Sequence, residues 1–165
     1  MFTHGWNGNR NTFLSYNADN GNESLVKKFT ETIHDSYIYV ASFTNFNELD
    51  LKNITTEYYK AEIEELDSEA LSDISKHIAI IFDGYNTFEG HDYIYTQFNY
   101  MMSNILYQYK KLNNNLLPKV NLIGHSRGGL TNMQYALDHP DIVASLTSFG
   151  TDRKSTRLNS SHRCI

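Results

Sequence analysis

The sequence is poor in cysteine and has no long apolar segment. Its single cysteine, Cys164, is the penultimate of 165 residues, so no internal disulfide framework can form. No apolar run approaches the roughly 18 to 20 residues that a membrane-spanning helix needs. These two absences argue against a disulfide-stabilised scaffold and against a transmembrane helix in this stretch. The cysteine content does not distinguish a secreted protein from a cytoplasmic one.

Patterns that hold metals or cofactors are also missing. The histidine and acidic residues do not show the spacing of zinc ligands. No glycine-rich loop has the form that cradles phosphate groups. We therefore expect no metal and no cofactor.

Basic residues are fewer than acidic ones, 14 against 19, which gives a formal charge of −5. Four of the basic residues and one acidic residue fall within residues 152–165. Without that segment, 10 basic and 18 acidic residues remain, and the formal charge becomes −8. Because residues 1–151 carry this net negative charge, a nucleic-acid partner is not expected.

A pentapeptide near the carboxyl end has the pattern G-x-S-x-G. It runs from Gly124 to Gly128 and follows an apolar stretch over 120–123. A nucleophilic serine in this pattern stands on a sharp turn between a strand and a helix, where large side chains do not fit next to it. After the turn, Leu130, Met133 and Leu137 recur at helical spacing and predict a helix that buries them. Ser126 is the candidate nucleophile, and the alternative is a glycine-rich turn without chemistry.

A second motif lies at the start, where Phe2, Thr3, His4, Gly5 and Trp6 predict the end of a strand and a tight turn. The two motifs together resemble the α/β-hydrolase superfamily, in particular bacterial lipases and esterases. The resemblance covers residues 2–151. It implies a serine nucleophile whose oxyanion is held by two backbone N–H groups.

On this resemblance the oxyanion donors are the amides of Trp6 and Arg127, and His4 braces the oxyanion loop. Gly5, Gly124 and Gly128 give the site its clearance. His125 is the variable residue of the motif, and it points away from the serine.

His4, His125 and His139 are not convincing general bases, whereas geometry leaves His91 and His34 open. His139 is about 20 Å from Ser126 along the predicted helix, at 1.5 Å per residue. His91 and His34 each lie beside an aspartate in a turn-like stretch, where a helix cap or a solvated loop is the expected role. The resemblance implies a triad carboxylate and histidine beyond Thr151.

The last residues depart from the family pattern. Residues 152–165 resemble a translated sequencing adapter, and we expect them to be a non-native tail after a partial hydrolase domain over 1–151. Met1 also stands where a strand is expected, so the domain is expected to be incomplete at both ends. Lacking its base, the chain as printed is expected to be nearly inactive.

Between the two motifs, helical and strand patterns alternate. Helices are expected over 25–33, 57–76 and 93–112, and strands over 37–41, 77–82 and 144–149. Such alternation predicts an α/β fold with a mostly parallel sheet flanked by helices. The stretch 57–82 is an expected insertion or added sheet strand. Loop 83–90 is expected to be a plain connection, with a wall of the substrate site as the alternative.

The expected activity is hydrolysis of a carboxylic ester, of lipase or carboxylesterase type, through an acyl-enzyme on Ser126. The substrate is then a small-molecule or lipid ester. The turn over residues 124–128, called the nucleophile elbow, also serves thioesterases, amidases and acyltransferases. These activities therefore stay open as alternatives. A non-catalytic binding module with a hydrolase-like scaffold is the alternative outside enzymes.

Overall fold

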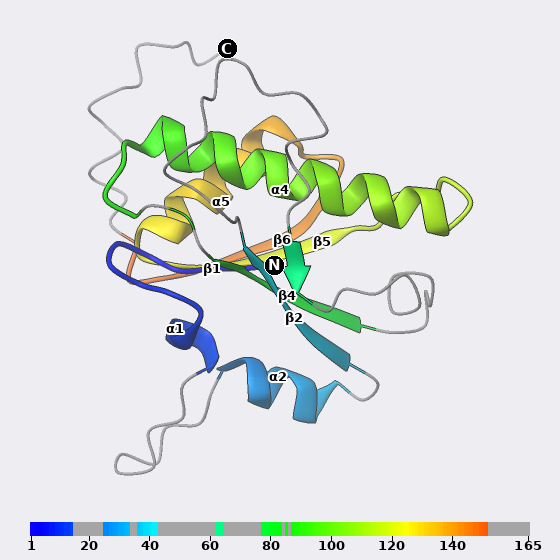
Figure 1. The fold of residues 1–165 in the computed structure, drawn as a ribbon, viewed down its shortest axis with the longest axis horizontal. Coiled ribbons are helices and arrows are strands. Elements are labelled where there is room, and N and C mark those ends of the chain that lie inside the picture. Colours follow the sequence, from blue (N-terminus) through cyan, green and yellow to red (C-terminus); the bar gives the residue numbers. More distant parts are fainter. Residues whose placement is uncertain are drawn as a thin grey trace.

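The computed structural model describes residues 1–14, 25–33, 36–42, 62–64, 77–83, 85 and 87–151. A central six-stranded sheet has the order β3-β2-β4-β1-β5-β6 (Figure 1). Its strands are β1 (Phe2–Thr3), β2 (Ser36–Ser42), β3 (Glu62–Glu64), β4 (His77–Asp83), β5 (Val120–His125) and β6 (Val143–Phe149). Four neighbouring pairs are parallel, and only β2 and β3 are antiparallel. The predicted fold class, a mostly parallel sheet with flanking helices, is confirmed.

Helices cover both faces of the sheet. The long helix α4 (His91–Leu112) and α5 (Arg127–Asp138) lie on one face, whereas α1 (Asn11–Leu14) and α2 (Leu25–Thr32) lie on the other (Figure 1). Strand side chains alternate between the faces, so neighbouring residues enter different cores. Ile80, Phe82 and Leu122 pack with α4, while Ala79 and Ile81 pack with Phe2, Phe13 and Val26.

The apolar side chains along one face of α4 belong to the hydrophobic core. Phe98, Met101, Met102 and Ile105 are buried against the sheet, as expected from their helical spacing. The Phe98 ring meets the rings of Phe82 and Tyr135 edge to face, at centroid distances of 5.4 Å in both cases.

Two predictions about individual elements were wrong. The helix expected over 57–76 is replaced at Glu62–Glu64 by β3, which pairs with Val40, Ala41 and Ser42 of β2. Pairing with an open sheet edge overrides the helical pattern there. The rest of 57–76 lies outside the described residues, as do His34 and residues 152–165.

The buried face of α5 also differs from the prediction. Leu137 is 71% exposed, and Gly128, Thr131, Asn132 and Tyr135 are buried instead. These small and polar residues let the helix approach the sheet closely. The Thr3 hydroxyl donates to Asn132 Oδ1 at 2.8 Å in this buried layer, so a hydrogen bond compensates for the burial of polar groups.

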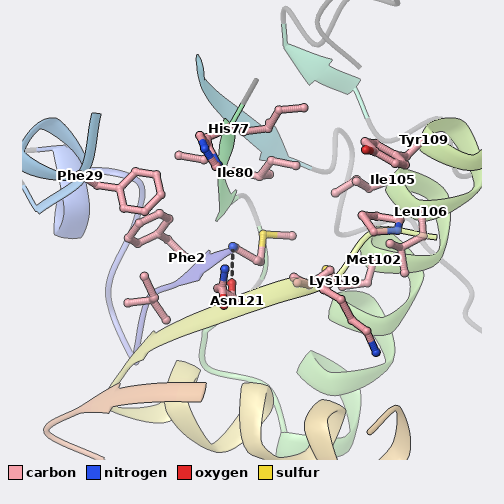
Figure 2. Close-up of a pocket in the computed structure, with 16 residues that line it drawn as sticks. Phe2, Phe29, His77, Ile80, Met102, Ile105, Leu106, Tyr109, Lys119 and Asn121 are labelled. Carbon is pink, nitrogen blue, oxygen red and sulfur yellow. Dashed lines mark hydrogen bonds between the residues drawn. The ribbon is translucent and has the colours of Figure 1, made fainter. Parts of the chain in front are cut away.

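A cavity of about 360 Å³ opens at the amino ends of β4 and β5 (Figure 2). Met1 and Phe2 line it together with residues of β4, α4 and β5. The Met1 backbone nitrogen donates to the Asn121 carbonyl at 2.8 Å beside it. Ser126 follows the carboxyl end of β5, so this cavity and the predicted site lie at opposite ends of the sheet.

We expect the core behind the elbow to dominate stability. Leu122→Ala removes a fully buried side chain, and Leu137→Ala makes the same change at an exposed position. Leu122→Ala should lower the free energy of unfolding by about 2 to 5 kcal/mol. Leu137→Ala should change it by less than about 0.5 kcal/mol. Urea unfolding followed by circular dichroism measures both, and equal losses would contradict the assigned burial.

Candidate active site

The candidate site lies where parallel strands end together. Thr3 pairs with Phe82 of β4 and Gly124 of β5, so the loops that follow these strands emerge at the same edge of the sheet. The β1 loop carries His4 to Trp6, and the β5 turn carries Ser126. The two sequence motifs, more than 100 residues apart, therefore meet at one edge, where open α/β sheets bind their ligands.

Ser126 occupies a backbone conformation that few residues adopt. Its φ is 53° and its ψ is −122°, between β5 and the first residue of α5. Such strain persists only where surrounding structure enforces it. Here the Ser126 amide donates to the Phe149 carbonyl at 2.8 Å, and its carbonyl accepts from the Gly129 amide and the Thr151 hydroxyl, both at 3.0 Å.

Two glycines of the motif are required by close backbone contacts. A Cβ added at Gly124 would lie 2.5 Å from the Gly129 Cα. A Cβ added at Gly128 would lie 2.1 Å from the Thr3 carbonyl oxygen and 2.4 Å from that of His4. Because backbone atoms cannot rotate away, a side chain at Gly124 would force β5 and α5 apart, and one at Gly128 would force α5 away from β1.

The backbone of Gly5 lies directly against the candidate nucleophile. A Cβ at Gly5 would stand 2.7 Å from Ser126 Cβ and 3.2 Å from Ser126 Oγ. The next residue is Trp6, and the residue after Ser126 is Arg127. Within the described part of the chain, neither the Trp6 nor the Arg127 amide donates a hydrogen bond. Both amides directly follow residues, Gly5 and Ser126, whose atoms pack against each other.

His4 is buried beneath this loop. Its Nδ1 lies 3.1 Å from the Gly5 carbonyl oxygen, so Nδ1 carries the hydrogen and donates. Its Nε2 lies 3.4 Å from Asp83 Oδ1. This is within the distance of an ion pair, but the two atoms do not have the geometry of a hydrogen bond. The ring stacks on Tyr85 with centroids 4.3 Å apart.

Asp83 and Tyr85 complete the support under His4. Asp83 ends β4, and its two carboxylate oxygens accept from the backbone and the guanidinium of Arg10, at 3.1 and 2.7 Å. The Tyr85 hydroxyl donates to the His4 carbonyl. Burial, reinforced by the Asp83 charge, raises the pKa of Tyr85, so its hydroxyl keeps the proton that it donates. Sequence reasoning did not single out either residue, although an aspartate directly after an apolar strand is a usable signal.

No histidine among the described residues donates to Ser126 or accepts from it. His125 is exposed, His77 lies at the far end of the sheet, and His139 Nε2 lies 3.2 Å from Asn99 Oδ1. His91 begins α4 and is half-buried. Burial lowers its pKa, with the Asp92 charge opposing and the Arg127 charge reinforcing that shift.

The described residues show neither a cluster of metal-binding side chains nor a helix suited to span a membrane. Among the described residues, no group of three or more histidine, cysteine or acidic side chains converges on one point. No helix in the same residues is long and apolar enough to cross a membrane.

The steric requirement at Gly128 gives a test of the elbow. Gly128→Ala should destabilise the fold by about 2 to 3 kcal/mol, because its Cβ would overlap the Thr3 and His4 carbonyls. Gly90→Ala is the matched control, since nothing lies within 4 Å of a Cβ there and the backbone is ordinary. Thermal unfolding of both variants compares them, and an unchanged Gly128→Ala variant would contradict the close approach of α5 to β1.

His91 gives a test of the burial at the start of α4. The pKa of His91 is lowered in the folded state. Well above pH 6.5, which is the pKa of a histidine in the unfolded chain, His91 is neutral in both states and should not change the folding stability. Stability should fall as the pH drops below 6.5, since the unfolded chain then binds a proton more readily. His91→Gln should flatten that fall in urea unfolding at pH 7.5, 6.5 and 5.5. The exposed His77→Gln is the control, and an equal change in both variants would contradict the assignment.

Comparison with known proteins agrees with this geometry. The family model described as the alpha/beta hydrolase fold matches residues 70–163, more than half of the chain. A triacylglycerol lipase of Pseudarthrobacter phenanthrenivorans is 53% identical over 40 residues, which are 24% of this chain and 12% of that lipase. A triacylglycerol lipase of Burkholderia plantarii is 53% identical over 40 residues, 24% of this chain and 11% of the lipase.

The aligned segment thus spans only about an eighth of the length of these curated relatives. No solved structure matches the chain. The family match covers β4, the elbow and β6, and it agrees with the observed parallel sheet and its flanking helices. The chain belongs to the alpha/beta hydrolase fold family.

Proposed function

We propose that this chain carries the nucleophile of a serine hydrolase that cleaves carboxylic esters, of lipase or carboxylesterase type. One observation carries the proposal. Ser126 stands in a strained conformation at a strand-to-helix turn, with the backbone of Gly5 packed against its side chain. Such a turn serves to present a hydroxyl to a substrate carbonyl.

In the proposed reaction, Ser126 Oγ attacks the ester carbonyl carbon, and the carbonyl oxygen becomes an oxyanion. The amides of Trp6 and Arg127 hold that oxyanion, because both lie beside the serine without another acceptor in the described residues. Arg127 is the first residue of α5, so the positive end of the helix dipole adds to the stabilisation.

The proton of Ser126 passes to a histidine base, which a carboxylate orients. We propose that both follow Thr151, which is consistent with the family order of serine, carboxylate and histidine. The histidine then gives the proton to the departing alcohol, and an acyl-enzyme remains. Water, activated by the same histidine, attacks the acyl group, releases the acid and restores Ser126.

Exposed aromatic surface on the β1 loop and the loop before α4 supports an ester with an apolar acyl or alcohol part. Trp6 and Phe88 are 63% and 68% exposed, and their rings meet at a centroid distance of 5.7 Å. Exposed aromatic pairs of this kind gain by covering apolar groups. The lipase names of the two partial relatives agree with such a substrate, which we propose to be a small-molecule or lipid ester.

Ser126→Ala should abolish ester cleavage in the full-length protein. We expect kcat for 4-nitrophenyl butyrate to fall by about 10⁴-fold or more, because the nucleophile is removed. Fluorophosphonate labelling, read as an intact-mass increase, should vanish as well. Ser103→Ala on the exposed surface of α4 is the control and should retain both signals.

Three results would redirect the proposal. Labelling of Ser126 without ester turnover, but with thioester or amide turnover, would assign the site to another acyl transfer. Absence of labelling and of all turnover would favour a binding module. Labelling that persists in Ser126→Ala would place the nucleophile elsewhere.

A further inference from the structure

The loop between β4 and α4 touches both segments that carry the proposed oxyanion donors. Its described residues are Tyr85 and 87–90, and we call four of them, Tyr85 and Thr87 to Glu89, the brace loop. It contacts the β1 loop around Trp6 on one side and the elbow at Arg127 on the other. A connection of this kind links two donors that are about 120 residues apart in sequence.

Thr87 lies at the centre of these contacts and is only 6% exposed. Its hydroxyl accepts from the Asn7 amide at 3.0 Å. Its backbone carbonyl accepts from Arg127 Nη1 at 2.8 Å, and the Glu89 carbonyl accepts from the other terminal nitrogen of the same guanidinium. One residue therefore bonds to the neighbour of the first donor and to the side chain of the second.

The β1 loop turns directly after Trp6. Asn7 has a φ of 54°, a left-handed conformation that asparagine adopts more readily than most residues, and its backbone N–H is held by the Thr87 hydroxyl. On the other side of Trp6, the carbonyl of His4 accepts from the Tyr85 hydroxyl, and the Tyr85 ring stacks on that of His4. The brace loop thus holds the chain both before and after Trp6.

We propose that Thr87 is a positioning residue for the oxyanion hole: it fixes the Trp6 amide through Asn7 and the Arg127 amide through the Arg127 guanidinium. This inference rests on the proposed function of Ser126, and it adds a role for a residue that does not touch the substrate. Oxyanion donors act only within about 2.7 to 3.1 Å of the developing charge. A misplacement of about 1 Å costs on the order of 10²-fold in rate.

Thr87 binds Asn7 through its side chain and Arg127 through its backbone, so a side-chain substitution can remove the first contact and keep the second. Thr87→Val deletes the hydroxyl that accepts from Asn7 while keeping the side-chain volume and the carbonyl that accepts from Arg127. Thr87→Ser keeps the hydroxyl. Thr96→Val removes a hydroxyl that donates to the Asp92 carbonyl within α4, and serves as the control for loss of a threonine hydroxyl away from the site.

In the full-length protein, Thr87→Val should lower kcat for 4-nitrophenyl butyrate by about 10- to 100-fold, with KM changed less than about threefold. Affinity for butylboronic acid, which mimics the tetrahedral intermediate, should fall in proportion to kcat/KM. Thr87→Ser should have a kcat within about threefold of the wild-type value. Thr96→Val should have the wild-type kcat.

Amide hydrogen exchange over residues 5–8 tests the same inference without catalysis. Thr87→Val should raise exchange of this segment by about tenfold, whereas Thr87→Ser and Thr96→Val should leave it unchanged. If the unchanged protein shows no Ser126-dependent turnover, the proposed function fails, and the exchange result still decides whether Thr87 orders the Trp6 loop. Equal kcat losses in Thr87→Val and Thr87→Ser, or unchanged exchange in Thr87→Val, would overturn the inference.

Discussion

The structure depends on the contact between Gly128 and the end of β1. The Gly128 position leaves so little room that a Cβ would lie 2.1 Å from the Thr3 carbonyl oxygen. This contact seats the first turn of α5 on the sheet and brings the elbow against the β1 loop. The strained backbone of Ser126 and the close approach of Gly5 to its side chain lie at the same junction.

The polar groups buried under this contact are arranged in two layers. Thr3 and Asn132 join the strand to the helix with one hydrogen bond. Below the loop, His4 lies between the Gly5 carbonyl, the Tyr85 ring and the Asp83 carboxylate, which Arg10 also binds. Hydrogen bonds in these layers join the loop and helix to the strand ends. They leave His4 Nε2 and Asn132 Nδ2 without a hydrogen-bond partner among the described residues.

The sequence predicted those features that obey local rules. The elbow, its strand and its helix were predictable because the glycines of G-x-S-x-G are needed wherever such a turn forms, and the stripe of α4 from Phe98 to Ile105 followed from helical spacing. The pairing of Glu62–Glu64 as β3 was missed, because a sheet edge distant in sequence decided it. The buried side of α5 was missed for a similar reason: close approach to the sheet selects Thr131 and Asn132 over Leu137. The contacts of Thr87 join residues about 40 and 80 positions apart, and no local pattern encodes them.

The acceptors of the Arg127 guanidinium are both backbone carbonyls, those of Thr87 and Glu89. A carbonyl is present whatever the side chain, so the anchor does not depend on the identity of residue 89. Residue 127, by contrast, is a variable position of the elbow motif, yet here its side chain has a defined partner. In this chain, residue 89 can therefore change without loss of its carbonyl acceptor, whereas exchange of Arg127 removes both hydrogen bonds to the loop. A variable position in a short motif can in this way be tightly coupled to a loop that carries no motif of its own.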